Sequence, residues 1–368
     1  MRRARCVRDD RPMTDTRTAE LADIWRYVAD TACRDYSPLY DRICRTVADD
    51  DAVLALVQEA PPEGHFPNVL LGAVHYLLLG GLDHPLAAVY AGESDADPGP
   101  LFVDVCLSHR AEIVDLLATR HTNTNEVGRS ALLGPAFTEV ARRLGAPLGL
   151  VDVGCSAGLN LFCDRYRLDY GAAGATGPAD APVRIECTVL GGAPPIAAGL
   201  PEIVGRTGLD LDPVDVRDDD ATRWLLACVW PDTGRLPRTR RAIEEAKHDP
   251  PTIVAGDAVE GITDLVLGLP DGATPVVTTT WMLAYLSREH RVAFREALAA
   301  ASRTRPIAWV SAEGAGVVDR FAGVEPPTDA QGMEASVFGL VTFRAGAIDD
   351  TELLGFVHPH GGWIDWRV

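Results

Sequence analysis

The stretch Leu148-Gly-Leu-Val-Asp-Val-Gly-Cys-Ser-Ala-Gly-Leu-Asn-Leu-Phe162 decides which fold we expect for this chain. A short apolar run ends in the small residues of Gly154–Gly158, and apolar residues at helical spacing resume at Leu159. The order predicts a strand, a tight turn and the start of a helix. Such a turn lets backbone N–H groups and the positive end of the helix face a polar ligand closely.

The turn fits three motifs to different degrees. Gly-Cys-Ser-Ala-Gly spells G-x-S-x-G, the nucleophile elbow of α/β-hydrolases, with Ser156 as the nucleophile. A dinucleotide fingerprint needs glycine where Ser156 and Leu159 stand, so that match is poor. The stretch also resembles the first motif of class I S-adenosylmethionine (SAM)-dependent methyltransferases, Asp/Glu-x-Gly-x-Gly-x-Gly, running from Asp152 to Gly158 with Ser156 in place of the middle glycine.

Strands and helices alternate after this turn. The patterns predict strands over 183–190, 208–213, 252–258, 275–281 and 306–311, with helices between them, and a late antiparallel pair over 336–344 and 352–357. Strands separated by helices imply right-handed parallel crossovers. We therefore expect an α/β fold with a doubly wound, mostly parallel sheet and an antiparallel edge.

The residues before the turn show only helical patterns. They predict an all-helical N-terminal domain over 14–145, which includes helices over 101–120 and 128–144, followed by the α/β domain over 146–368. Residues 1–13 are expected to be a disordered extension. The apolar run 69–79 is too short to span a bilayer and is expected to be a buried core helix.

Composition narrows the classes of partner and compartment. The 368 residues carry a formal net charge of −19, which disfavours nucleic acid and anionic membranes as partners. The eight cysteines contain no C-x-x-C pair, so neither a zinc module nor a small disulfide scaffold is expected, and no metal site is predicted. The basic start lacks an apolar segment of the secretory type. We expect a cytoplasmic protein.

Polar residues recur where the predicted strands end. The turn at Gly154, Asp210, Asp257 and Thr280 all follow strands, and ligands of doubly wound sheets bind outside those carboxyl ends. Over about 146–368 the chain therefore resembles class I SAM-dependent methyltransferases. The resemblance implies SAM as cofactor, with its methionine part on the turn, its ribose on Asp210 and its adenine near Asp257. Glu186 competes for the ribose if the long spacing to Asp210 is not an insertion.

The cofactor-binding residues expected from the resemblance and from the strand ends are Asp152, Gly154, Cys155, Ser156, Gly158, Asn160, Asp210, Asp257, Ala258 and Thr280.

The acceptor of the transferred group is expected to be a small molecule, bound between the strand ends and the helical domain. Among the residues that we expect around it, Glu126 is the candidate base, Arg129 the candidate carboxylate clamp and Tyr285 the candidate partner of the sulfonium. The polar stretch 121–129 has a second interpretation, in which Asn123 and Glu126 cap a helix. The residues expected to line the acceptor pocket are Asn125, Glu126, Arg129, Asn160, Trp281 and Tyr285.

Other functions stay open from the sequence alone. The strings TNEVGR, SAGLNL, GLDLDP and WPD, after a helical N-terminal half, make nearly the whole chain similar to a bacterial family of unknown function. A SAM-consuming lyase or cyclase on the same fold is one alternative, and a SAM-binding or scaffold protein without activity is another. An α/β-hydrolase would combine Ser156 with Asp257 and with His358 or His360.

Overall fold

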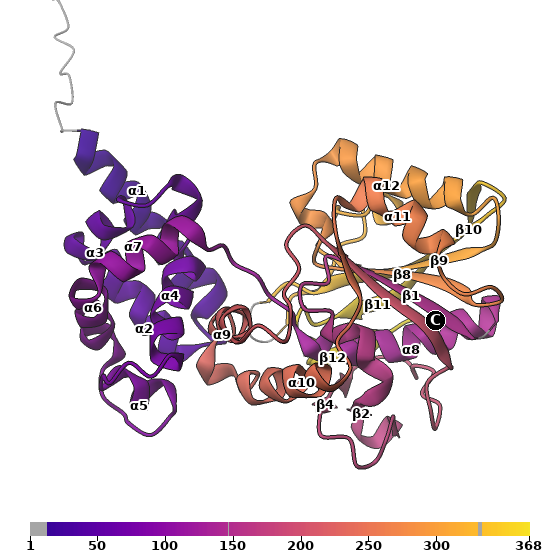
Figure 1. Cartoon of the computed structure of the whole chain (residues 1–368), viewed down its shortest axis with the longest axis horizontal. Helices are drawn as coiled ribbons and strands as arrows, with labels where there is room; N and C mark the ends of the chain where they lie inside the picture. Colours follow the sequence, from indigo (N-terminus) through magenta and orange to yellow (C-terminus); the bar gives the residue numbers. More distant parts are fainter. Residues whose placement is uncertain (1–12, 146, 330–332) are drawn as a thin grey trace, which may run out of the picture. The chain divides into compact units, whose positions relative to one another are not determined.

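The computed structural model describes residues 13–145, 147–329 and 333–368. It divides into two compact units (Figure 1). The helical unit is the described part of Met1–Thr122 together with Ala227–Arg235, and the sheet unit is the described part of Asn123–Leu226 and Leu236–Val368. The extension predicted for residues 1–13 lies outside the described residues except for Met13, where the first helix begins.

The helical unit confirms the all-helical prediction for the N-terminal part of the chain. Its elements are α1 (Met13–Val28), η1 (Ala29–Cys33), α2 (Pro38–Ala48), α3 (Asp51–Val57), η2 (Pro62–His65), α4 (Pro67–Leu79), α5 (Leu86–Tyr90), α6 (Pro98–Ser108), α7 (Arg110–Thr119) and η6 (Pro231–Thr233).

Local sequence signals explain where several of these helices begin and end. Ser37 caps α2, because its side chain accepts a hydrogen bond from the Tyr40 N–H at 3.2 Å. Pro67 occupies the first position of α4, where a missing N–H does no harm. The single helix predicted over 101–120 is wrong: at His109 the backbone leaves helical geometry, and α6 and α7 meet there.

A short segment far along the chain belongs to the helical unit. Asp232 accepts hydrogen bonds from the Ser37 hydroxyl at 2.6 Å and from the Leu39 N–H at 2.9 Å, and the Trp230 ring packs against the Tyr40 ring. The unit boundary also lies at Thr122 rather than at residue 145, because the helix that follows packs on the sheet. The predicted division at 145/146 is corrected accordingly.

The sheet unit contains the rest of the described elements. The helical ones are η3 (Val127–Arg129), α8 (Ser130–Leu144), η4 (Leu159–Arg165), η5 (Gly171–Ala173), α9 (Asp219–Ala227), α10 (Leu236–His248), α11 (Ala258–Leu267), η7 (Leu283–Tyr285), α12 (Arg288–Ala301) and η8 (Asp319–Phe321). The strands are β1 (Leu148–Val153), β2 (Arg167–Asp169), β3 (Ala175–Thr176), β4 (Arg184–Glu186), β5 (Thr188–Val189), β6 (Ile203–Asp210), β7 (Ile253–Ala255), β8 (Thr274–Thr280), β9 (Ile307–Glu313), β10 (Ser336–Arg344), β11 (Ala347–Val357) and β12 (Trp363–Trp366).

The main sheet confirms the predicted α/β class with an antiparallel edge. Its order is β5-β12-β11-β10-β9-β8-β1-β6-β7, and the run from β9 to β7 is parallel throughout. β10 and β11 form the predicted antiparallel pair. Read across the sheet, the five parallel strands are β7, β6, β1, β8 and β9. Their order along the chain therefore falls as far as β1 and rises after it, so the direction of winding reverses beside β1. In doubly wound sheets ligands bind at the carboxyl ends of the strands at this reversal.

Helices cover both faces of this sheet (Figure 1). Along β1, Leu148 and Leu150 join the core under α8 and α10, whereas Val151 and Val153 join the core under α11 and α12. Side chains of a strand alternate between faces, so an almost continuous apolar run is what a strand buried on both sides requires.

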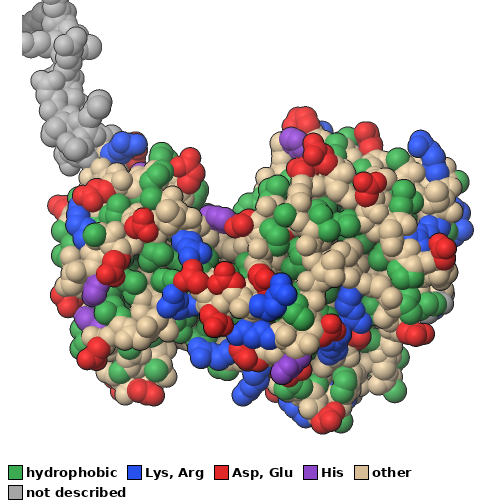
Figure 2. Space-filling model, in the orientation of Figure 1, with side chains coloured by type: hydrophobic (Ala, Val, Ile, Leu, Met, Phe, Trp, Pro, Cys, Tyr) green, Lys and Arg blue, Asp and Glu red, His purple; other side chains and the backbone are tan. Residues whose placement is uncertain are grey.

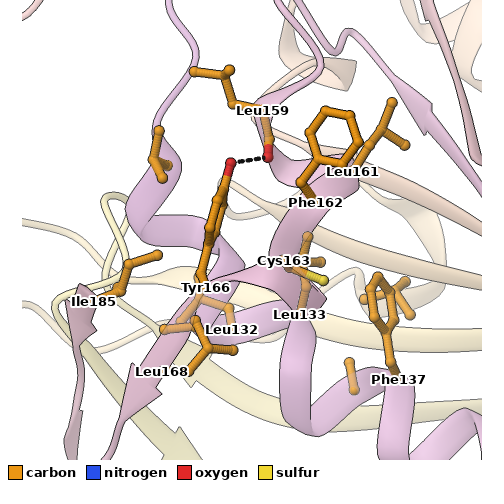
Figure 3. Close-up of a cluster of buried hydrophobic side chains, with 14 of the residues drawn as sticks. Leu132, Leu133, Phe137, Leu159, Leu161, Phe162, Cys163, Tyr166, Leu168 and Ile185 are labelled. Atoms are coloured by element: carbon orange, nitrogen blue, oxygen red, sulfur yellow. Dashed lines mark hydrogen bonds between the residues drawn. The ribbon is translucent and has the colours of Figure 1, made fainter. Parts of the chain in front are cut away.

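The helix predicted to start at Leu159 forms as the 3₁₀ helix η4 rather than as an α-helix. Tyr166 is fully buried below it and donates its hydroxyl proton to the Leu159 carbonyl at 2.7 Å (Figure 3). The chain then enters a small separate sheet of order β3-β2-β4. The strand predicted over 183–190 is split between this sheet and the edge of the main sheet, because β4 pairs with β2 and β5 pairs with β12.

The surface in view carries both signs of charge. Figure 2 shows Lys and Arg side chains interspersed with Asp and Glu, so the acidic excess forms no single patch on that face. Within the ranges that the structure describes, no helix has the length and apolar character needed to cross a membrane. The apolar run at 69–79 lies in α4, where Val69–His75 are buried.

Candidate functional site

The turn after β1 contains three residues with left-handed backbone angles. The φ values are +71° at Gly154, +53° at Ser156 and +67° at Gly158. Glycine adopts such angles without steric cost, whereas a serine adopts them less readily. Ser156 thus stands in a conformation that suits glycine, as expected for the middle position of the Gly-x-Gly-x-Gly pattern.

Asp210, the last residue of β6, lies directly beside this turn. Its Oδ2 accepts a hydrogen bond from the Ser156 N–H at 2.7 Å, and its Oδ1 accepts one from the Asp212 N–H at 2.9 Å. Glu186 is exposed on β4, in the other sheet. The sequence offered Asp210 and Glu186 as alternative ribose-binding acids. Of these two, Asp210 is the one that lies next to the turn.

Asp152 is a buried acid one strand away, on β1. The Thr278 hydroxyl donates to its Oδ1 at 2.6 Å. Burial raises the pKa of Asp152 to about 6, although the Thr278 hydrogen bond and the charge of Arg129 lower it. A carboxyl in this state exchanges its proton close to neutral pH.

Two asparagines fasten the turn to the elements around it. The Asn125 side-chain oxygen accepts from the Leu159 N–H at 2.9 Å, and the Asn160 side-chain oxygen accepts from the Ser130 hydroxyl at 2.8 Å. Both side chains are buried. They were predicted to line a pocket. In the structure Asn160 ties η4 to the first residue of α8, and Asn125 ties the start of η4 to the segment that precedes η3.

Glu126 lies at the start of η3 and is occupied by protein groups. Its Oε1 accepts from the Gly128 N–H at 2.8 Å and pairs with Arg238 at 2.8 Å, while its Oε2 lies 3.9 Å from the His360 Nδ1. Glu126 therefore caps η3 through its own side chain. The predicted capping box does not form, because the Asn123 side-chain N–H donates to the Asp212 carbonyl at 3.2 Å.

Arg129 braces two loops at the carboxyl ends of the strands. Its Nε donates to the Pro359 carbonyl at 2.9 Å, and its Nη1 donates to the Thr280 carbonyl at 2.8 Å. Its charge also lowers the pKa of two buried acids, Asp152 and Glu313. The role of carboxylate clamp stays a prediction, and the observed role is that of a brace.

Three other residues that were predicted to bind the cofactor have structural contacts in this region. Asp257 caps α11 with one oxygen, since its Oδ1 accepts from the Val259 N–H at 2.7 Å and the Glu260 N–H at 3.2 Å. Ala258 is the first residue of that helix. Cys155 is buried against Gly208, and burial raises the pKa of its thiol, so it packs rather than reacts.

The segment after β8 holds two of the residues that we predicted around the acceptor, Trp281 and Tyr285. Tyr285 is 86% exposed. Trp281 has a φ of +59°, an outlier for a bulky residue, and its indole N–H donates to the Ser336 hydroxyl at 2.7 Å.

The structure assembles no hydrolase triad on Ser156. Its hydroxyl is buried and has no hydrogen-bond partner among the described residues. His358 accepts the His360 N–H through Nδ1 at 3.0 Å and lies 3.9 Å from Asp329 through Nε2, while Asp257 caps α11. A nucleophilic serine needs a base within hydrogen-bond reach, and none of these groups occupies that place.

Sequence reasoning missed Glu313, the last residue of β9. Its side chain is fully buried, its Oε1 accepts from the Met282 N–H at 3.1 Å and the Leu283 N–H at 3.2 Å, and burial raises its pKa to about 7. The predicted strand stopped at residue 311, two positions too early. The rule that found Asp210 and Asp257, an acid at a strand end, also fits Glu313.

Two other features carry none of the predicted chemistry. A depression of about 380 Å³ in the helical unit, lined by residues that include Pro38, Arg42 and Asp232, contains no predicted site residue. Over the described ranges, no three His, Cys, Asp or Glu side chains are grouped to hold a metal ion. The acids and the left-handed turn at the strand ends therefore form the candidate site.

Comparison with known proteins identifies one family. A family model described as "uncharacterized protein conserved in bacteria (DUF2332)" matches residues 22–366. This match confirms the similarity to a bacterial family of unknown function. No curated protein and no solved structure gives a significant match.

Proposed function

For this chain, which belongs to the DUF2332 family of bacterial proteins, we propose from the geometry of the strand-end site that it binds SAM and transfers its methyl group to a small molecule. One observation carries the proposal: the Asp210 carboxylate lies against the N–H of Ser156 in a left-handed turn, where the strand order reverses. A ribose-holding acid beside a small-residue turn is the arrangement that the motif resemblance implies.

The residues at this site suit the chemical groups of SAM. The Ser156 hydroxyl is buried and lacks a hydrogen-bond partner within the described chain, so a polar ligand group can engage it. Each carboxylate oxygen of Asp210 accepts one backbone N–H and keeps a further lone pair for a ribose hydroxyl. Leu211, beside it, is 74% exposed and offers apolar surface for a flat ring.

Buried charge also favours a cationic ligand at the turn. Asp152 and Asp210 are acids at neighbouring strand ends, and the charge of Asp210 raises the pKa of Asp152. A ligand ammonium near Asp152 would stabilise its ionised form. The α-amino group of SAM supplies such a charge.

Positioning accounts for much of the rate in a methyl transfer, because the displacement is in line. When bound, SAM supplies an electrophilic methyl group on a sulfonium. The chain supplies a rigid turn, which Asn125 and Asn160 hold in place, and a brace at Arg129. Since Glu126 is paired with Arg238, we do not assign it the role of base.

The first prediction is that the protein binds S-adenosylhomocysteine, which carries the same ribose and amino group. Asp210→Ala should weaken binding by at least about tenfold, because a lost charge-assisted hydrogen bond is worth roughly 1.5–3 kcal/mol. Isothermal calorimetry measures both affinities. Glu186→Gln is the matched control and should bind as the wild type does.

The absence of heat and of any thermal shift at millimolar ligand would overturn the cofactor proposal. If SAM binds, mass spectrometry after incubation with a cell extract identifies the chemistry. A methylated product supports transfer, whereas a SAM fragment formed without any acceptor supports a lyase or cyclase.

The second prediction concerns the proton on Asp152. Because its pKa is raised to about 6, binding of S-adenosylhomocysteine at pH 6 should release about half a proton as the ligand ammonium ionises the carboxyl. The release is measured in Glu313→Gln, so that the other buried acid with a raised pKa contributes no proton. Calorimetry in two buffers of different ionisation heat measures this release. It should vanish at pH 8, in Asp152→Asn, and with methylthioadenosine, which lacks the ammonium. Equal release with both ligands would contradict the assignment.

A further inference from the structure

The side chain of Met282 occupies the space beside Gly154. A Cβ added at Gly154 would lie 2.2 Å from the Met282 Cγ and 2.6 Å from its Cβ, so this methionine packs on the bare backbone of the turn. Glycine at a ligand-binding turn permits close approach of another group. Here the approaching group is a thioether side chain of the protein itself.

Met282 belongs to a strained segment, Trp281–Leu286, between β8 and α12. Trp281 has a φ of +59°, and two hydrogen bonds hold the residue in place. Its backbone N–H donates to the Ala312 carbonyl at 3.0 Å, and its indole N–H donates to the Ser336 hydroxyl at 2.7 Å. Such backbone angles are unfavourable for a bulky residue and persist only where neighbours enforce them. The segment therefore begins with a residue that its neighbours hold in an unfavourable backbone conformation.

Glu313 is the main polar anchor of this segment. Its Oε1 accepts the N–H groups of Met282 and Leu283, whereas its Oε2 is buried without a hydrogen-bond partner in the described part of the chain. Ser311, two positions earlier and on the same side of β9, also has a buried hydroxyl without a partner among described residues. Buried polar atoms without partners are unfavourable, so this closed arrangement lies above its lowest possible free energy.

We propose that Trp281–Leu286 is a gate over the Gly154 turn, latched by Glu313, and that Met282 holds the place into which the sulfur-bearing chain of a ligand must move. The identity of that ligand rests on the proposed function, whereas the latch itself does not. Glu313 is a positioning residue: it acts through the two N–H groups that it holds.

Ionisation of Glu313 controls the latch. Burial raises its pKa to about 7 from an ordinary value of 4.5, against the lowering effect of the two N–H groups and of the charges on Arg129 and Arg291. Opening the gate returns the carboxylate to water and to its ordinary pKa. The closed form thus binds the proton more tightly, and closure weakens as the pH rises through 7.

Hydrogen exchange of the Met282 and Leu283 amides tests the latch without any ligand. After correction for the intrinsic rate, their protection in the wild type should fall about tenfold between pH 6 and pH 8. Glu313→Gln keeps an oxygen acceptor but cannot ionise, so protection should persist with no pH dependence. Glu313→Ala should lose protection at both pH values. The same pH dependence in the wild type and in Glu313→Gln would overturn the latch.

Binding of S-adenosylhomocysteine tests what the gate covers. Met282→Ala removes the side chain that must be displaced and should bind several-fold more tightly than the wild type. Leu267→Ala removes an exposed apolar side chain elsewhere in the sheet unit and should have no effect.

Each outcome separates the two proposals. Equal affinity of wild type and Met282→Ala overturns the gate and leaves the cofactor proposal standing, while binding by Met282→Ala alone supports both. If neither protein binds, the cofactor proposal fails. The latch is then judged by hydrogen exchange alone, which needs no ligand.

Discussion

Glu313→Gln is expected to stabilise the protein by about 2–3 kcal/mol at pH 8 and by less than about 1 kcal/mol at pH 5. The carboxyl of Glu313 is fully buried, and its pKa is raised to about 7. A raised folded-state pKa gives stability that is complete below the unfolded pKa and is lost as the pH rises through the folded one. Glutamine removes this loss because it carries no charge at either pH.

Urea unfolding at pH 5 and pH 8 measures the difference. Glu186→Gln, which changes an exposed glutamate, should alter the free energy of unfolding by no more than about 0.5 kcal/mol. The pKa of Asp152 is raised as well, so the Glu313→Gln variant should still lose some stability as the pH rises. Destabilisation by Glu313→Gln at pH 8, or an equal effect at both pH values, would contradict this account.

Gly361→Ala is expected to destabilise the sheet unit by more than about 3 kcal/mol. Gly361 has a φ of +77°, and an added Cβ would lie 2.1 Å from the Gly128 carbonyl oxygen. Gly128 is equally restricted, since its own Cβ would lie 2.3 Å from the His360 carbonyl oxygen. Backbone meets backbone here, so no side chain can move aside, and the Arg129–Pro359 contact next to it is lost as well.

Gly272→Ala separates the cost of the left-handed backbone from the cost of the steric clash. Gly272 has a φ of +81°, but no atom lies within 4 Å of an added Cβ. Its replacement should therefore show only the cost of a left-handed alanine, about 1–2 kcal/mol. Thermal and urea unfolding compare the two variants. Similar losses for both would show that the close approach at Gly361 contributes nothing.

Local patterns were sufficient wherever a short-range rule governs structure. Ser37 and Pro67 begin helices because caps and proline act within one turn, and the apolar run that became β1 was long enough to require burial on both faces. The strand-end rule likewise grouped the Gly154 turn with Asp210, which the hydrogen bond to Ser156 joins.

Other features depended on partners that are distant in the chain. The 3₁₀ geometry of η4 accompanies hydrogen bonds from Tyr166 and to Asn125 that no local propensity encodes. The strand predicted over 183–190 divides because its two halves find different neighbours, β2 and β12. Glu126 was expected to act as a base, but it is paired with Arg238, 112 residues further on.

By itself the sequence determined the α/β class, the helical N-terminal part, the antiparallel edge and the acids at the strand ends, because periodicity, turn residues and strand-end polarity are local properties. The tertiary structure alone decided which of these groups meet. It placed Asp210 rather than Glu186 at the turn, turned Arg129 into a brace, and brought Met282 and Glu313 to the site. Burial and the pairing of distant strands set those contacts, and neither is visible in a linear pattern.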